Sequence, residues 1–297
     1  MKTSSNTDVY QIITDLIIEK LEQGSIPWKQ PWNDYGSAQN YISQKPYRGI
    51  NQLILNVLHA KPFYLTFKQA HSLGGRIKKG AKSIPVTYWN FTFRDKESGR
   101  KLTAEEAKNR PSKQIAKSAY LKYYRILNIE DVLNVDFDLP ETIVGKDDYS
   151  IACCDALLFE MKDRPDIRHE HNDAFYNPIQ DYINMPPIEH FHTAELYYSI
   201  LHHELIHSTG HPKRLNRFEH HEVSSYGSKD YSKEELIAEI GASFLNGHAG
   251  ILNETTLADS SAYIQGWLQK LCNDKKFIFE ASAQAQRAVD YILNHGS

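Results

Sequence analysis

Two histidines and a glutamate stand in the spacing of a metal-dependent hydrolase: His203, Glu204 and His207 form the pattern His-Glu-x-x-His. Residues four positions apart on a helix share one face, so His203 and His207 can both bind one divalent ion. Glu204 would lie next to a water molecule held at that ion and could take its proton. The pattern therefore predicts a metal-assisted hydrolase, with Zn²⁺ as the expected ion and another divalent metal as the alternative.

A catalytic zinc site usually has three protein ligands, and the third must come from outside this motif. Ten residues after His203, where one class of zinc peptidases has a third histidine, the chain has Lys213. The segment YSKEELIAEIGASFL supplies Glu235 and Glu239, one helical turn apart. Its pattern is similar to the second helix of gluzincin-type peptidases, in which the first acid binds metal and the second orients a ligand histidine.

Two assignments of the third ligand stay open. In the first, Glu235 binds the metal and Glu239 supports the site from the next turn. In the second, Ser232 and Glu235 form a capping box at the start of their own helix, and Glu239 becomes the ligand. Glu234 is predicted to face away from the ion as ordinary surface.

The segments around the motif suit a metal site. The segment TAELYYSILHHELIHSTG predicts one helix, with Thr193 as its N-cap and Gly210 at its C-terminal end. His202 projects about 100° away from His203 on this helix and is not expected to bind the ion. Close approach of the following acidic helix is favoured by three small residues on it, Ala238, Gly241 and Ala242.

Charge divides the 297-residue chain into two unlike halves. Residues 1–130 hold 21 Lys and Arg against 10 Asp and Glu, a net of +11, whereas residues 131–297 hold 13 against 27, a net of −14. The basic first half indicates a polyanionic partner. The short apolar runs and three cysteines lead us to expect neither a membrane span nor a disulfide framework.

Basic and aromatic residues gather in the first half. The loop GSIPWKQPW sets two tryptophans beside a lysine, and GGRIKKGAKSIPVTYWNF follows a basic run with aromatic residues. Cations can follow phosphates while aromatic rings stack on bases, as a single-stranded nucleic-acid binder requires. The residues predicted to contact single-stranded DNA are Trp28, Lys29, Trp32, Arg48, Asn51, Lys68, Arg76, Lys78, Lys79, Lys82 and Trp89. The alternative is that the tryptophans are core residues and the lysines form a solvated face.

Two domains are expected from this organisation. Residues 1–135 would form an α+β domain in which IPVTYWNFTF and AYLKYYRILNIEDV pair as strands. The polar stretch 94–118 between them is predicted to be a mobile excursion. A linker over residues 136–148 would lead to the metal-binding domain at residues 149–297. The predicted fold class is therefore α+β, in two domains.

Both halves resemble one known family, in the same order along the chain. VYQIITDLIIEKLEQGSIPWKQPW, PYRGINQLIL, GGRIKKGAKSIPVTYW and YYRILNIEDV are similar to the N-terminal single-stranded-DNA-binding domain of ArdC-type antirestriction proteins. DYINMPPIEHFHTAELYYSILHHELIHSTGHPKRLNR and YSKEELIAEIGASFL are similar to their C-terminal metallopeptidase domain. The resemblance implies a zincin-like fold of gluzincin type for the second half. It also implies that His203 and His207 are ligands, that Glu204 is the catalytic acid and base, and that Glu235 and Glu239 supply the third ligand and its support.

The resemblance further implies a function. Such a protein acts in the cytoplasm, binds single-stranded DNA and helps incoming plasmid DNA to escape host restriction during conjugation. Its peptidase domain would act on an unknown protein substrate or a component of the restriction system, and no membrane partner is expected. The alternative is a non-proteolytic protein that shields single-stranded DNA and whose metal domain is structural or a docking surface. Glu204 favours an active site, since a structural zinc site needs no general base.

Overall fold

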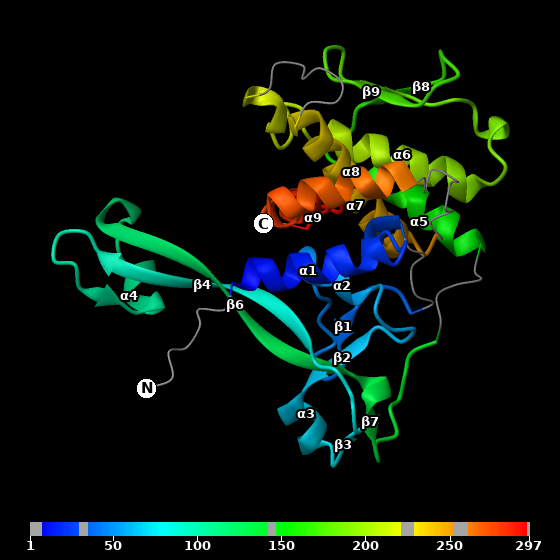
Figure 1. Ribbon diagram of the computed structural model, residues 1–297. Helices are drawn as coiled ribbons and strands as arrows, with labels where there is room; N and C mark the ends of the chain where they lie inside the picture. The colour runs from blue at the N-terminus through cyan, green and yellow to red at the C-terminus, as the bar shows by residue number, and fades with distance from the viewer. Residues whose placement is uncertain (1–7, 30–34, 142–146, 221–228, 252–260, 296–297) are drawn as a thin grey trace.

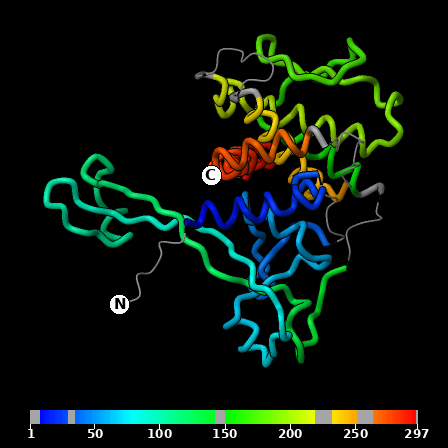
Figure 2. The backbone as a smooth tube through the Cα atoms, in the orientation of Figure 1, coloured from blue at the N-terminus to red at the C-terminus, as the bar shows by residue number. Residues whose placement is uncertain are grey.

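The computed structural model describes residues 8–29, 35–141, 147–220, 229–251 and 261–295 (Figures 1 and 2). These residues form a mixed α+β first half and a second half in which helices predominate. Among them, no helix is long and apolar enough to span a membrane. All three cysteines are free thiols.

The first half is built on a five-stranded sheet with the order β1-β2-β6-β4-β5. β1 and β2 run parallel, and the other neighbouring strands are antiparallel. The strands of this half are β1 (Gln39–Asn40), β2 (Phe63–Thr66), β3 (Arg76–Ile77), β4 (Ile84–Asp95), β5 (Lys101–Leu102), β6 (Ile115–Asn128) and β7 (Val132–Leu133), of which β3 and β7 form a separate pair. Its helices are α1 (Val9–Glu22), α2 (Ile50–Leu55), α3 (Phe67–Ser72) and α4 (Ala104–Lys108), with 3-10 turns η1 (Pro27–Lys29), η2 (Ser112–Gln114) and η3 (Ile129–Asp131).

The predicted pairing of the two longest strands is confirmed. β4 and β6 pair antiparallel from Ile84 opposite Ile126 to Asp95 opposite Ile115. The two strands leave the body of the molecule as a two-stranded ribbon, and its far end carries α4 (Figure 1). The stretch predicted to be a mobile excursion therefore contains β5, α4 and η2, and its mobility stays a prediction.

In the second half, helices and a small sheet of order β8-β10-β9 surround the His-Glu-x-x-His segment. β8 runs parallel to β10, and β9 runs antiparallel to it. The strands are β8 (Asp166–Arg168), β9 (Phe175–Asn177) and β10 (Tyr182–Asn184). The helices are α5 (Asp147–Glu160), α6 (Ala194–Ser208), α7 (Lys229–Ala249), α8 (Ser261–Asn273) and α9 (Phe277–Ile292), with 3-10 turns η4 (Ile188–His190) and η5 (Arg217–His220).

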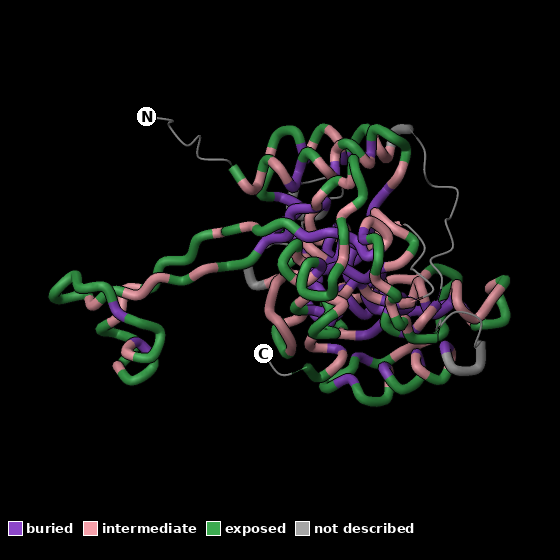
Figure 3. The backbone as a smooth tube through the Cα atoms, turned by 90° about the horizontal axis from the view of Figure 1, so that it is seen from below, coloured by how far each residue is buried: buried purple, intermediate pink, exposed green. Residues whose placement is uncertain are grey.

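One hydrophobic core joins the two halves. Ile13 and Ile17 of α1 are buried in the same cluster as Ile278 of α9. The Tyr10 ring meets the Phe279 ring edge-on, with centroids 4.8 Å apart. Figure 3 shows buried backbone concentrated in the body and largely exposed or half-buried backbone along the ribbon. The first half therefore packs directly on the helices of the second, and the predicted boundary at residues 136–148, of which 142–146 lie outside the described residues, stays a prediction.

Helices α6 and α7 approach each other closely at a glycine, as the small residues of the acidic helix predicted. A Cβ atom added to Gly241 would lie 2.7 Å from Cδ1 and 2.8 Å from Cγ1 of Ile206. Carbon atoms at such a separation repel strongly, so a larger residue would push the helices apart. The glycine thus permits the short distance between the two helices.

We expect Gly241→Ala to lower the free energy of unfolding by about 1–3 kcal/mol, because overpacking against Ile206 outweighs the ~1 kcal/mol that alanine gains from helix propensity. The control is Gly266→Ala in α8, where an added Cβ meets no atom within 4 Å. That variant should be as stable as the parent or up to ~1 kcal/mol more stable. Denaturant unfolding measures both, and a stabilised Gly241→Ala would contradict the close packing.

Candidate metal centre

Helix α6 positions both predicted histidine ligands. The Thr193 side chain caps the helix by accepting a hydrogen bond from the backbone N–H of Leu196 at 3.2 Å, which confirms the predicted start. Leu205 is fully buried on the core side. The side chains of His203 and His207 are 25% and 14% exposed, so they lie at the edge of the core where an ion and a substrate can reach them.

The two histidines meet a carboxylate from α7. The Nε2 atoms of His203 and His207 are 3.1 Å apart. Oε2 of Glu235 lies 3.6 Å from Nε2 of His203, and its Oε1 lies 3.6 Å from Nε2 of His207. A tetrahedral site with bonds of ~2.1 Å holds its ligand atoms about 3.4 Å apart, so these three residues fit a divalent ion. They form a metal-ligating group in which one atom of each lies within 4.8 Å of the others.

The predicted general base lies directly beside this group. Glu204 follows His203 on α6 and is only 8% exposed. Its negative charge is close enough to help raise the pKa of His207. Burial in a partly desolvated site suits a carboxylate that must accept a proton from water.

Glu234 contradicts the prediction that it faces away as ordinary surface. Its Oε1 lies 3.4 Å from Nδ1 of His207, and its side chain is 19% exposed. The Arg217 guanidinium holds the same carboxylate with two hydrogen bonds, of 2.6 and 3.2 Å. Arg217 also donates to the carbonyl of Ile206 at 2.9 Å and to the hydroxyl of Thr209 at 2.6 Å. Glu234 is therefore fixed between α6, α7 and η5.

This carboxylate orients the imidazole of His207. When Nδ1–H donates to Glu234, the lone pair of Nε2 faces His203 and Glu235. Burial alone would lower the pKa of His207, but the hydrogen bond to Glu234 and the charges of Glu234, Glu204 and Glu235 raise it instead. The sequence carried no signal for this role, because Glu234 has no distinctive spacing and its arginine partner lies in a separate segment.

Glu239, the other candidate for third ligand, has different partners. Its carboxylate accepts a hydrogen bond from the hydroxyl of Tyr263 on α8, and this hydroxyl accepts another from Nε1 of Trp28 at 3.1 Å. Burial raises the pKa of Glu239, although Tyr263, Lys29 and His203 act in the opposite direction. The structure thus brings Glu235, and not Glu239, to the two histidines. Glu239 instead links the second half to the first.

His202 lies on the buried side of α6, away from the metal-ligating group. Its Nδ1 is 2.7 Å from Oδ1 of Asn246 on α7. Burial lowers the pKa of His202 to about 4, so this imidazole is neutral at pH 7. His202 therefore has a structural role between α6 and α7, as its direction on the helix indicated.

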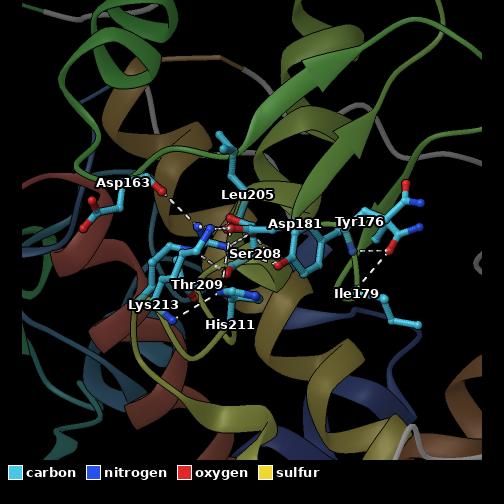
Figure 4. Close-up of polar contacts among 12 residues, drawn as sticks. Asp163, Tyr176, Ile179, Asp181, Leu205, Ser208, Thr209, His211 and Lys213 are labelled. Atoms are coloured by element: carbon cyan, nitrogen blue, oxygen red, sulfur yellow. Dashed lines mark hydrogen bonds and ion pairs between the residues drawn. The ribbon is translucent and has the colours of Figure 1, made fainter.

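A buried arginine fastens the chain just after α6 to the small sheet. Figure 4 shows its partners Asp163, Tyr176, Asp181 and Ser208 lying close together. The Arg214 side chain is fully buried and pairs with Asp181. It also donates to the carbonyl of Ser208 at 2.6 Å, to the carbonyl of Asp163 at 2.9 Å and to the hydroxyl of Tyr176 at 3.1 Å. Partial burial would raise the pKa of Asp181, but the hydrogen bonds from Arg214, Tyr176 and Lys213 and the charge of Arg214 together outweigh it, and the pKa falls to about 2. The C-terminal end of the ligand helix is thereby held in place.

Two of the residues predicted to contact DNA are structural instead. Trp28 is 2% exposed and its ring meets Trp267 edge-on at 5.7 Å, so it is a core residue and cannot stack on a base here. The Asn51 side chain donates to the backbone carbonyl of Thr87 and accepts from its N–H, both at 2.7 Å. This amide ties α2 to β4 and has little capacity left for a nucleotide.

The remaining predicted DNA contacts are dispersed over the first half. Lys29 lies over the Tyr263 ring, with its ammonium 4.2 Å from the centroid, and Arg48 pairs with Asp290. Trp89 lies on the ribbon and is 51% exposed. Exposed cations at or near α3 and β3 are Lys68, Arg76, Lys78, Lys79 and Lys82, of which Lys78 donates to the carbonyl of Glu130. Trp32 lies outside the described residues.

Both halves match known families. The pattern of the N-terminal domain of the anti-restriction factor ArdC matches residues 7–126, and that of the zincin-like metallopeptidases matches residues 155–284. The crystal structure of the metal-free antirestriction protein ArdC from plasmid R388 is similar over 97% of this chain and 97% of its own, with 33% identity and a TM-score of 0.71. The chain belongs to the ArdC antirestriction family.

Other proteins similar to this chain include a metal-bound crystal structure and two much longer proteins. The Mn(II)-bound structure of ArdC from plasmid R388 matches with 32% identity, the same coverage of 97% on both sides and a TM-score of 0.71. Two proteins of Escherichia coli named DNA primase TraC are 32% and 31% identical over 96% of this chain. The chain spans only 27% and 20% of their lengths. The two-domain α+β fold and its zincin-like second half are thus confirmed, and a divalent metal suits the ligand group.

We expect Glu234→Gln to weaken the binding of Mn²⁺ or Zn²⁺ by about 10- to 100-fold, because a neutral amide supports the ligand imidazole of His207 less well than a carboxylate. The matched control is Glu280→Gln, which removes an exposed carboxylate on α9 that pairs with Lys233. Calorimetric titration of each metal into the full-length variants measures the effect. Parental affinity in Glu234→Gln would show that Glu234 does not position His207.

Proposed function

We propose that this protein is an antirestriction factor that binds single-stranded DNA and carries a zinc-dependent peptidase, which together protect incoming plasmid DNA from host restriction during conjugation. The observation that carries this proposal is the convergence of His203, His207 and Glu235 beside the buried carboxylate of Glu204. Family membership supports the antirestriction role. The substrate class is a protein, either one bound to DNA or a component of the restriction system.

The residues divide the reaction between them. A divalent ion bound by the three ligands would polarise a peptide carbonyl and an attacking water molecule. The Glu204 carboxylate accepts the proton of that water and passes it to the nitrogen of the leaving amine. Glu234 holds the imidazole of His207 through Nδ1, so that the ligand geometry persists while Glu204 changes its protonation state.

A second candidate is a non-proteolytic protein that shields single-stranded DNA. The observation in its favour is the long ribbon of β4 and β6, which carries exposed aromatic side chains on strands remote in sequence from the metal ligands. In that case the metal domain would be structural or a docking surface. The two candidates differ in whether Glu204 is needed.

We expect Glu204→Gln to abolish protection of conjugated plasmid DNA in a restricting recipient while single-stranded DNA binding is unchanged. The reason is that an amide cannot accept the proton of the attacking water. Glu195→Gln, near the start of the same helix, is the control and should protect normally. Transconjugant frequencies in restricting and non-restricting recipients, together with DNA titrations, measure both activities. Full protection by Glu204→Gln would favour the shielding protein.

A further inference from the structure

The ribbon formed by β4 and β6 exposes an unusual set of rings. The aromatic side chains on it that are more than a third exposed are Tyr88 (42%), Trp89 (51%), Phe91 (43%), Tyr120 (39%) and Tyr124 (40%). Large rings are normally buried, and an exposed cluster of them marks an interaction surface. Figure 3 shows the backbone of the ribbon standing clear of the body over most of its length. We call these five residues the aromatic ribbon.

The strand register distributes the rings over both faces. Tyr88 lies opposite Lys122 and Asn90 lies opposite Tyr120, so Tyr88 and Tyr120 share one face. Tyr124, opposite Val86, lies on that same face, and its ring centroid is 5.9 Å from that of Tyr88. Trp89 and Phe91, two positions apart, project from the other face. Two rings at alternate positions of a strand are separated by about 7 Å, a distance that suits neighbouring bases of an extended single strand.

Each face also carries cations placed at these rings. The ammonium of Lys117 lies 4.2 Å from the centroid of Phe91, and that of Lys122 lies 5.3 Å from the centroid of Tyr120. Arg125 lies 6.0 Å from the ring of Tyr123, a half-buried ring of β6 outside the five exposed ones. Between residues 84 and 94 and between residues 116 and 128 the sequence has no aspartate or glutamate. The body of the ribbon is therefore positive and aromatic.

This combination favours nucleic acid over a protein partner. A protein-binding patch concentrates its apolar area on one face, whereas here rings occur on both faces and alternate with Asn90, Thr92 and Ser118. Aromatic rings stack on bases without reading sequence, and flanking lysines neutralise phosphates. Bases can displace the lysines from their positions over the rings, which frees the ammonium groups for the backbone.

We propose that single-stranded DNA binds along the aromatic ribbon, with bases stacked on its rings and phosphates contacted by Lys117, Lys122 and Arg125. This inference rests on the proposed single-stranded DNA binding. It moves the main contact surface from the basic residues near β3 to the strands β4 and β6. Of the residues predicted from sequence to bind DNA, only Trp89 belongs to the aromatic ribbon.

The test is a titration of a fluorescently labelled oligothymidylate of 20 nucleotides with the full-length protein. Trp89→Ala and Tyr120→Ala should each weaken binding by about 5- to 100-fold, the loss expected for one stacked base. Lys117→Gln and Lys122→Gln should each reduce the slope of log affinity against log salt by about 0.7. Binding should also quench the tryptophan fluorescence of the protein, and this quenching should disappear in Trp89→Ala.

Matched controls are Phe67→Ala on α3 and Phe159→Ala on α5, which remove rings that are 66% and 89% exposed outside the ribbon. Both should bind with parental affinity, and thermal unfolding verifies that every variant is folded. Parental affinity in the ribbon variants would overturn the inference and leave DNA binding by the protein intact. If the parent protein itself does not bind the oligonucleotide, both the inference and the DNA-binding part of the proposed function are wrong.

Discussion

The close contact between α6 and α7 is the constraint on which the candidate site depends. Gly241 lets Ile206 approach the backbone of α7, and the same contact sets Glu235 opposite His203 and His207. A metal site needs its ligand atoms within a few tenths of an ångström of their places, so helix separation matters as much as ligand identity. A pair of helices that stood one methyl group further apart would separate the carboxylate from the imidazoles.

Buried charged groups then hold the end of this helix pair. Arg217 links Glu234 to the backbone at the end of α6, and Arg214 links the following turn to Asp181 near β10. Each guanidinium is paired with a carboxylate and donates further hydrogen bonds, which is the condition under which a buried charge is tolerated. In addition, Trp28 of the first half donates a hydrogen bond to the hydroxyl of Tyr263, which in turn donates to the carboxylate of Glu239 on α7. Helix α7, which carries Glu235, is thus in contact with both halves of the chain.

Features governed by local sequence could be predicted. The His-Glu-x-x-His spacing, the N-cap at Thr193 and the pairing of β4 with β6 follow from helix geometry, capping chemistry and strand patterns within short segments. Glu235 as the carboxylate that faces Nε2 of both histidines was one of two alternatives, since residues 235 and 239 are one turn apart and spacing alone does not choose between them.

Features governed by distant contacts could not be predicted. The role of Glu234 depends on Arg217, and the burial of Trp28 depends on Tyr263 and Trp267, which lie more than 230 residues away in sequence. Composition gave the first half a basic character but could not show where its rings are exposed. The rings are exposed because β4 and β6 extend beyond the body of the molecule, and the extent of that projection is visible only in the folded sheet.

Metal content is the most direct test of the central claim that His203, His207 and Glu235 hold a divalent ion. Elemental analysis of purified full-length protein should find about one equivalent of a divalent metal. Glu235→Ala should lose it, whereas Glu239→Ala should retain it. Retention of the metal by Glu235→Ala together with its loss from Glu239→Ala would contradict the account, because the carboxylate bonded to Tyr263 would then be the ligand.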